Sequence, residues 1–269
     1  MTELLELVDS HCHVHFDDYD GDRKTVLADS AAAGVSRLIC VGCSLKDSRR
    51  AVDFAKNQPG VWATAGAHPH DGAEYLGDRE ADSKLKDLLA NPGVVAVGEI
   101  GLDYYRDITP KSDQEKTLRA QIEIGLSTNL PFVFHVREAW DDFWKIFDSY
   151  KSTDRRIQGV IHSFSAPPGR LLEVLERGLY VSLNGLMTYT KDESWLEAAK
   201  KVPVDKLILE TDAPFLTPVP FRGRRCEPKH LVETCRFLAN LRNEEPLVLA
   251  SQSTKNAVKL FGLSEERLA

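Results

Sequence analysis

The chain has 269 residues and a formal net charge of −7, and its apolar and charged fractions, 42% and 28%, are ordinary for a globular protein. This length suits one large α/β barrel or two smaller domains, and we expect a single domain over residues 1–269. The negative charge argues against nucleic-acid binding through a broad basic face. It does not exclude a cleft of carboxylate ligands that admits one strand when metal fills it.

The sequence also limits where the protein can act. No apolar run is long enough to span a bilayer, and the N-terminal residues lack the basic flank of a secretory signal. Five cysteines, an odd number, do not suggest a disulfide framework. We therefore expect a reduced, cytoplasmic protein that is not bound to a membrane. The sequence does not fix the oligomeric state, although a monomer is slightly favoured.

Apolar, β-branched runs alternate with amphipathic stretches along the whole chain. The runs predict strands at Leu4–Val8, Arg37–Val41, Val61–Gly66, Val94–Gly98, Phe132–Phe134, Gly159–Ile161, Leu179–Leu183 and Lys206–Leu209. The stretches predict helices at Arg23–Ala33, Leu45–Lys56, Ser83–Ala90, Asp113–Thr128, Ala139–Tyr150, Gly169–Glu176, Glu193–Lys200, Lys229–Leu241 and Glu245–Phe261. Eight strands, each followed by a helix, predict an α/β fold of the (β/α)8 TIM-barrel type. A doubly wound open sheet is the alternative, weakened because no Gly-x-Gly-x-x-Gly follows a strand.

Polar residues gather at the predicted strand ends. Six of the eight histidines fall there, together with two carboxylates, and the set is His11, His13, His68, His70, Glu99, His135, His162 and Asp212. In (β/α)8 barrels the active site lies at the C-terminal ends of the strands. Each residue has a plainer reading: the histidines could be surface or hydrogen-bonded core residues, and Glu99 could pair with an arginine. The common placement at strand ends favours a site.

These residue types suit two divalent metal ions that share a bridging carboxylate. His11, His13, Glu99 and Asp212 would hold one ion, and His135 and His162 would hold the second with Glu99 as the bridge. Imidazole and carboxylate ligands suit Zn, Mn or Mg. Two ions roughly 3.5–4 Å apart generate a hydroxide between them and clamp a phosphoryl group. Asp103 and Tyr105 are expected to orient the ligands or support their loop.

A proline-rich loop follows the last predicted strand, from Pro214 to Pro220, and continues into Phe221-Arg-Gly-Arg-Arg225. We expect it to bring Arg222, Arg224 and Arg225 to the rim of the site for phosphate contact. Solvated loop charges are the alternative reading of these three arginines.

Several blocks of the sequence resemble the TatD family of metal-dependent deoxyribonucleases, which belongs to the amidohydrolase-type barrel superfamily. The blocks are Asp9-Ser-His-Cys-His13, Gly66-Ala-His-Pro-His70, Gly98-Glu-Ile-Gly-Leu-Asp-Tyr-Tyr105, Phe134-His135, His162-Ser-Phe164 and Glu210-Thr-Asp-Ala-Pro-Phe-Leu-Thr-Pro218. The resemblance implies the same six metal ligands, a phosphate contact for His68 and a water-assisting role for Asp212. It also implies substrate contacts from the arginine loop. A loop-supporting role for His70 is at least as well founded as substrate contact.

The resemblance implies a hydrolase that cleaves phosphodiester bonds of single-stranded DNA or DNA ends, as a 3′–5′ exonuclease, with Glu99, Asp212 and His68 as its catalytic residues. Two departures from the family pattern put substrate choice in doubt. Cys226 stands where Asn is usual, and Ser163-Phe-Ser-Ala166 has Ser for Cys and Ala for Gly. An amide, lactone or aminoacyl-ester hydrolase on the same metals is the alternative. A non-catalytic binding protein is a third reading, and the complete ligand set argues against it.

Overall fold

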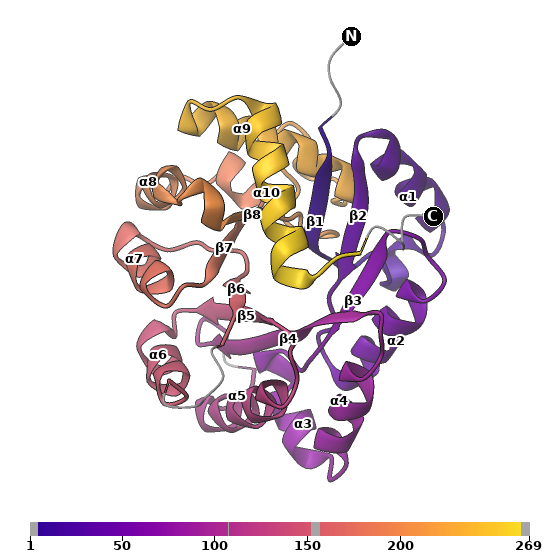
Figure 1. Ribbon diagram of the computed structural model, residues 1–269, viewed down its shortest axis with the longest axis vertical. Helices are drawn as coiled ribbons and strands as arrows, with labels where there is room; N and C mark the ends of the chain where they lie inside the picture. Colours follow the sequence, from indigo (N-terminus) through magenta and orange to yellow (C-terminus); the bar gives the residue numbers. More distant parts are fainter. Residues whose placement is uncertain (1–4, 107, 152–156, 265–269) are drawn as a thin grey trace. The chain divides into compact units, whose positions relative to one another are not determined.

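The computed structural model describes residues 5–106, 108–151 and 157–264. Eight strands form one sheet whose order follows the chain from β1 to β8 (Figure 1). Their bounds are β1 Leu7–Cys12, β2 Val35–Cys40, β3 Val61–Ala65, β4 Val94–Asp103, β5 Phe132–Arg137, β6 Gly159–Ile161, β7 Tyr180–Leu183 and β8 Leu207–Leu209. The pairs β1–β2, β3–β4, β4–β5, β5–β6 and β7–β8 are parallel. Every residue of β1 and of β4 is buried, as expected of parallel strands covered on both faces.

Helices separate the strands as the sequence predicts. They are α1 Arg23–Ala32, α2 Leu45–Ala55, α3 Gly72–Gly77, α4 Ala81–Leu89, α5 Lys111–Leu126, α6 Trp140–Asp148, α7 Pro168–Glu176, α8 Glu193–Lys201, α9 Leu231–Arg242 and α10 Pro246–Phe261. Local sequence sets several of their ends: Ser44 caps α2 by accepting a hydrogen bond from the Asp47 amide. The six-residue helix α3 was not predicted. None of the described helices is both long and apolar enough to cross a membrane.

Three strands continue further than predicted, and their added residues include polar ones that were expected at strand ends. Strand β1 begins at Leu7 and ends at Cys12 instead of Val8, while Leu4 lies outside the described residues. Strand β4 continues to Asp103 and β5 to Arg137, and they pair through Gly101 with His135 and Asp103 with Arg137. Ladder hydrogen bonds come from the backbone, so polar side chains do not end a strand. Glu99 therefore lies inside β4, not at its end as predicted.

Contacts between residues divide the chain into two compact units. We call Met1–Cys40, Gln58–Val61 and Ser163–Ala269 the terminal unit, and Val41–Asn57 with Trp62–His162 the central unit. In the terminal unit, α10 packs against β1 and β8 (Figure 1). In the central unit, α5 packs against β4. The single domain over residues 1–269 stays a prediction.

Candidate metal centre

Glu99 occupies an irregular part of β4, between two glycines. The pairing of β4 with β5 shifts register between Val97 and Ile100. A Cβ at Gly98 would collide with the Val133 carbonyl oxygen, and a Cβ at Gly101 would collide with the His135 carbonyl oxygen. Their φ angles, 150° and 155°, are also ones that other residues rarely adopt. The Gly-Glu-Ile-Gly segment thus lets β4 lie close against β5 with the Glu99 side chain at a fixed position.

Three histidines of the central unit surround the buried Glu99 carboxylate. Glu99 Oε1 lies 2.8 Å from His135 Nδ1, 3.0 Å from His162 Nε2 and 3.7 Å from His68 Nε2. Burial by itself would raise the pKa of Glu99, but the His162 and His68 imidazoles and the hydrogen bond with His135 bring that pKa well below its usual range. Glu99 is therefore an ionised acceptor. We call Glu99, His68, His135 and His162 the Glu99 group.

A second buried carboxylate, Asp103, stands on the other side of His135. Asp103 Oδ2 lies 3.0 Å from His135 Nε2 and 3.3 Å from His70 Nε2. Asp103 Oδ1 accepts hydrogen bonds from the amides of Tyr105 and Arg106. Asp103 therefore orients the imidazole of His135 and supports the turn after β4, as expected. The Tyr105 side chain is exposed and orients no ligand, but the Arg137 guanidinium of β5 stacks on it, 3.7 Å from the ring centroid.

The loop after β3 fixes the state of His68. The Nδ1 atom of His68 accepts a hydrogen bond from the His70 amide, at 3.1 Å, so the proton of the neutral ring resides on Nε2. Burial, partly opposed by Glu99, lowers the pKa of His68 to about 3. The Gln121 side chain holds the loop by bonding both backbone groups of Ala67. Gln121 had no role in the sequence analysis, and its one signal is a polar residue on the buried face of a helix.

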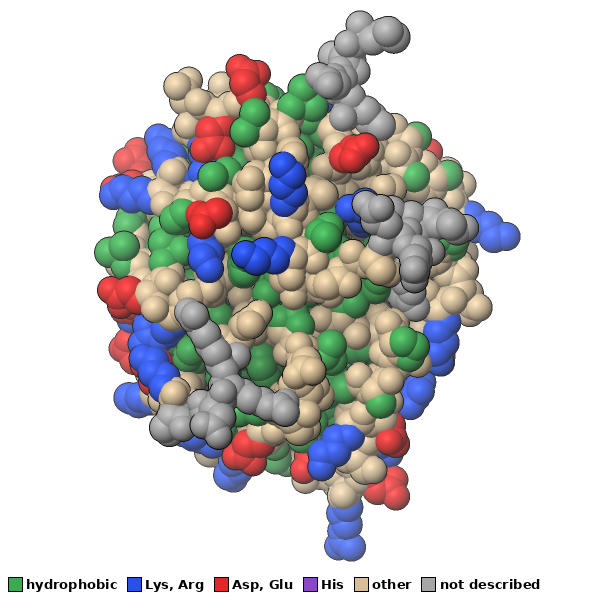
Figure 2. Space-filling model, viewed as in Figure 1, with side chains coloured by type: hydrophobic (Ala, Val, Ile, Leu, Met, Phe, Trp, Pro, Cys, Tyr) green, Lys and Arg blue, Asp and Glu red, His purple; other side chains and the backbone are tan. Residues whose placement is uncertain are grey.

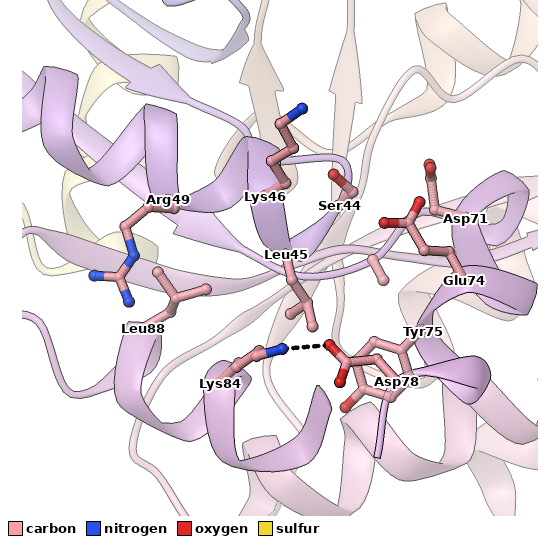
Figure 3. Close-up of a pocket in the computed structure, with 11 residues that line it drawn as sticks. Ser44, Leu45, Lys46, Arg49, Asp71, Glu74, Tyr75, Asp78, Lys84 and Leu88 are labelled. Carbon is pink, nitrogen blue, oxygen red and sulfur yellow. Dashed lines mark hydrogen bonds and ion pairs between the residues drawn. The ribbon is translucent and has the colours of Figure 1, made fainter. Parts of the chain in front are cut away.

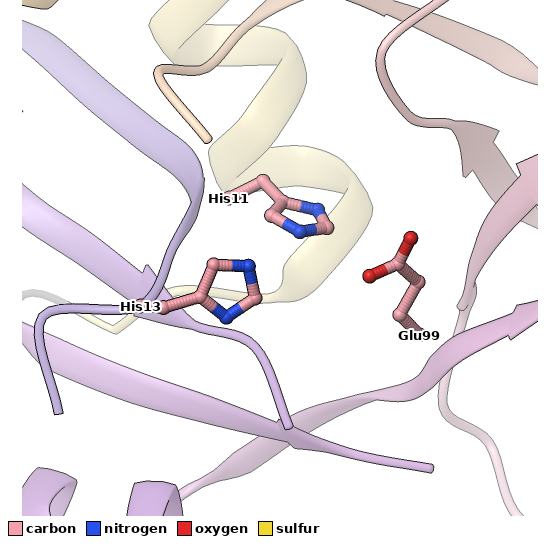
Figure 4. Close-up of side chains that lie close together, drawn as sticks. All are labelled: His11, His13 and Glu99. Carbon is pink, nitrogen blue, oxygen red and sulfur yellow. The ribbon is translucent and has the colours of Figure 1, made fainter. Parts of the chain in front are cut away.

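A second group of ligand candidates forms in the terminal unit, and we call it the Asp212 group. Asp212 Oδ1 lies 3.6 Å from His11 Nε2 and 3.4 Å from His13 Nε2. The two imidazoles lie beside each other, with ring centroids 5.1 Å apart (Figure 4). Figure 4 also draws Glu99, which belongs to β4. The Asp212 amide donates to the His11 carbonyl and the His13 amide to the Ala213 carbonyl, which fixes these residues through the backbone.

The side chain of Asp9, in β1, also links β1 to the segment that carries Asp212. It is fully buried and accepts hydrogen bonds from the amide and the hydroxyl of Thr211. Burial raises the pKa of Asp9 to about 8, although the bonds from Thr211 and His11 act against it. The sequence analysis gave Asp9 no role in holding Asp212. A buried aspartate inside an apolar strand was the available signal.

Both groups fit divalent metals by the chemistry of their donors. In the Glu99 group, atoms of His68, Glu99 and His135 lie within 4.8 Å of one another, and His162 Nε2 is 3.0 Å from the same Glu99 oxygen. Imidazole nitrogen and carboxylate oxygen together suit Zn, Mn or Mg, and the groups described here contain no thiolate. Of the six predicted ligands, the structure brings Glu99, His135 and His162 together in the central unit. It brings His11, His13 and Asp212 together in the terminal unit.

The three rim arginines differ from one another. Arg225 is engaged: it pairs with Asp22 at 2.6 Å and with Glu227 at 3.1 Å. Arg222 stacks on Tyr189, at 3.7 Å from the ring centroid, and donates to the Thr217 carbonyl. Arg224 is exposed and forms no ion pair with any residue that the structure describes. Arg224 is therefore the most available of the three for a substrate phosphate.

Comparisons with known proteins identify the family of the chain. A model of the family described as TatD related DNase matches residues 8–262. The chain is 33% identical over 258 residues to YabD, an uncharacterized metal-dependent hydrolase of Bacillus subtilis, with 96% of this chain and 100% of that protein covered. It is 36% identical over 248 residues to the 3′–5′ ssDNA/RNA exonuclease TatD of Citrobacter rodentium, with 90% and 93% covered.

The fold has a close match among solved structures. The crystal structure of YjjV, a TatD homologue from Escherichia coli K12, superposes with a TM-score of 0.89 at 27% identity, covering 97% of this chain and 100% of that one. This match, with the strand order, confirms the predicted (β/α)8 fold. The family model covers most of the chain, and both curated relatives exceed 30% identity over nine-tenths of it. The chain therefore belongs to the TatD-related DNase family of metal-dependent hydrolases.

Proposed function

We propose that the protein is a divalent-metal-dependent nuclease that hydrolyses phosphodiester bonds of single-stranded DNA from the 3′ end. The observation that carries the proposal is the Glu99 group: an ionised, buried carboxylate within 3.7 Å of three imidazoles, with Asp103 behind one of them. Among the relatives, the Citrobacter rodentium protein is a 3′–5′ ssDNA/RNA exonuclease, which supports this substrate class. The YabD relative carries no assigned substrate.

In this proposal His11, His13, Glu99, His135, His162 and Asp212 hold two ions of Mg, Mn or Zn. The two groups would act together because the C-terminal ends of parallel barrel strands share one face. Bound ions would supply a hydroxide from water and neutralise charge on the phosphoryl group. His68 would donate its Nε2 proton in a hydrogen bond to a phosphate oxygen, because its Nδ1 is occupied by the His70 amide. Asp212, 16% exposed, would orient the attacking water.

Nucleic-acid binding in this scheme is local. The formal net charge of the chain is −7, which argues against a broad basic face. On the face shown in Figure 2, where no histidine is visible, Lys and Arg side chains lie scattered among Asp and Glu. Attraction to phosphate would therefore come from bound metal and from a few cations near the site, of which Arg224 is one. Arg222 and Arg225 would act chiefly by shaping the loop that presents Arg224.

The test is digestion of single-stranded DNA by metal-stripped protein, with and without added Mg, Mn or Zn. Oligonucleotides labelled at the 5′ end should give a ladder that shortens from the 3′ end, and Glu99→Gln should remove it. An RNA oligonucleotide of the same sequence measures the preference between sugars. If protein shown to bind two ions cleaves neither nucleic acid, the proposal is wrong, and esters, lactones and amides become the substrates to assay.

A further inference from the structure

A pocket of about 420 Å³ lies in the central unit beside the loop that carries His68 (Figure 3). Helix α2 and the turn before it form one side, and the loop after β3 with α3 forms another. Its lining includes Ala67, which directly precedes His68, and the rings and chains of Leu45, Tyr75 and Leu88. This volume falls in the range of roughly 300–1,000 Å³ that is typical of small-molecule pockets. The metal-ligand candidates and His68 do not themselves line it.

One side of the pocket is cationic. Lys46 and Arg49, one turn apart on α2, both line it, and both are exposed (Figure 3). Within the described part of the chain, neither forms an ion pair or a side-chain hydrogen bond. Lys84, a third lining cation, is instead paired with Asp78 at 2.8 Å. Figure 3 draws their charged ends pointing apart, but both side chains are long and exposed, so they can turn toward one anionic group of a ligand.

The other side of the pocket is acidic. Asp71 and Glu74 lie near each other, across the pocket from Lys46 and Arg49 (Figure 3). Neither carboxylate has an ion-pair partner within the described residues. Burial, with Glu74 and Asp47 nearby, raises the pKa of Asp71 to about 6. A half-buried carboxylate with few water molecules around it is a strong acceptor for N–H donors of a ligand.

The acidic side is built on the His68 loop itself. The Asp71 amide donates to the His68 carbonyl at 2.8 Å, within the short 3-10 helix Pro69–Asp71. The position of Asp71 is therefore fixed to that of His68, to which the proposed function gives the scissile phosphate. A molecule bound in the pocket would therefore contact the loop that carries His68.

We propose that this pocket is a nucleotide subsite, which takes the nucleotide adjoining the scissile phosphate. A flanking phosphate would bind Lys46 and Arg49, the sugar and base would pack on Leu45, Tyr75 and Leu88, and the base edge would reach Asp71 and Glu74. Carboxylates accept from the amino groups of cytosine, adenine and guanine. Thymine has no amino group, so the subsite should disfavour it. This inference rests on the proposed nuclease function for its substrate class.

The first experiment measures cleavage of fluorescent single-stranded oligonucleotides by metal-loaded protein. The Lys46→Ala/Arg49→Ala variant should raise KM about tenfold with little change in kcat, since charge-assisted hydrogen bonds to phosphate are lost. It should also reduce the slope of log KM against log salt by about 0.7, the value for one phosphate of a single strand. Lys86→Ala, an exposed lysine of α4 outside the pocket, is the matched control. Equal KM values and salt slopes in wild type, variant and control would overturn the subsite.

The second experiment changes the base. The oligonucleotides carry either cytosine or thymine at one of the two positions that flank the scissile bond and are otherwise identical. At one of these positions, cytosine should give a kcat/KM about tenfold higher than thymine. Asp71→Asn replaces an acceptor by an amide that can also donate, so it should narrow this preference. A cytosine-to-thymine ratio of one in wild type at both positions, or a ratio unchanged by Asp71→Asn, would contradict the base contact.

A third measurement separates this inference from the proposed function. Calorimetry with metal-free protein tests direct binding of deoxycytidine 5′-monophosphate and thymidine 5′-monophosphate. Arg49-dependent binding that favours the cytidine nucleotide supports the subsite even if the protein cleaves no nucleic acid, in which case only the proposed nuclease function is wrong. Metal-dependent cleavage with no binding of either mononucleotide at millimolar concentration, and no effect of Arg49→Ala, would leave the nuclease standing and overturn the subsite.

Discussion

Glu99 lies 2.8 and 3.0 Å from the nearest nitrogens of His135 and His162, whereas Asp212 lies 3.6 and 3.4 Å from those of His11 and His13. The Glu99 side chain is 5% exposed and the Asp212 side chain 16%. Both groups combine one carboxylate with imidazoles, but His11 and His13 both come from the end of β1, whereas the histidines around Glu99 follow or belong to three different strands. Their different spacing reflects what holds each carboxylate in place.

The position of Glu99 is set mainly by contacts with other side chains, and the position of Asp212 mainly by backbone hydrogen bonds. Glu99 sits in a network that continues through His135 to Asp103 and His70. Asp212 is positioned by its amide bond to the His11 carbonyl and by the Asp9–Thr211 contact on the residue before it. Side-chain substitutions near Glu99 should therefore disturb several ligands at once, while the Asp212 side chain can be changed with its neighbours left in place.

The largest expected effect comes from Glu99→Gln. The amide keeps the size of the side chain but removes the charge that three imidazoles face, so one ligand of each proposed ion is lost. We expect kcat/KM for single-stranded DNA to fall about 10³-fold or more, and bound metal, measured by elemental analysis, to fall below one ion per chain. Circular dichroism should show a folded protein. The exposed Glu176→Gln is the control, and wild-type cleavage by Glu99→Gln would exclude Glu99 as a ligand.

Asp212→Asn should have a smaller and more selective effect. Because the Asp212 carboxylate lies beside His11 and His13 and pairs with no other residue that the structure describes, we expect the bound metal to fall from two ions to one. Cleavage should fall roughly 10²-fold, mainly in kcat, through loss of the group that orients water. Loss of both ions in this variant would show that the two groups are not independent, and would remove the contrast drawn between them.

Asp103→Asn tests the side-chain network around Glu99. Asp103 touches His135 but is not a proposed ligand, and loss of such an orienting carboxylate typically costs roughly 10–100-fold in metal affinity. Activity should return when metal is added in excess, which a defect in the reacting groups would not allow. Asp87→Asn, on the exposed face of α4, serves as the control. An unchanged metal titration would mean that Asp103 supports only the turn after β4.

The sequence was sufficient to predict the order of the strands, because the alternation of strands and helices is set by local pattern. The prediction failed where the position of a residue depends on backbone that is distant in the sequence. Glu99 lies inside β4 because Gly98 and Gly101 let that strand approach Val133 and His135, a contact that no local pattern contains.

The sequence also could not predict which charged side chains pair with residues far away in the chain. Three arginines in one loop looked alike, but Arg225 is engaged by Asp22, about two hundred residues earlier in the chain, and Arg222 by stacking on Tyr189. Helix α3 was missed because it begins and ends with glycine, a poor helix former, yet it carries Glu74 and Tyr75 of the proposed nucleotide pocket. Both the contacts of the arginines and the formation of α3 depend on tertiary packing.

The smallest expected effect concerns the stability of the loop that follows Asp212 and its dependence on pH. Glu227 lies 3.1 Å from Arg225 and 2.7 Å from Lys229, and its side chain is 17% exposed. Burial would raise the pKa of Glu227, but Lys229 and Arg225 outweigh it and lower that pKa. The stabilisation is therefore fully present above the unfolded value of about 4.3, and it is lost as pH falls through the lowered pKa of Glu227.

Glu227→Gln should lower the free energy of unfolding by about 1 kcal/mol at pH 7, as for a partly exposed ion-pair network. The difference from wild type should shrink below about pH 4, because the wild-type carboxyl is then protonated as well. Denaturant unfolding at pH 7 and at pH 3.5 measures both values, with Glu176→Gln as control. A difference that persists at pH 3.5 would assign the effect to the hydrogen bond that the His230 amide, in the 3-10 helix Pro228–His230, donates to the Glu227 side chain, instead of to the charge of Glu227.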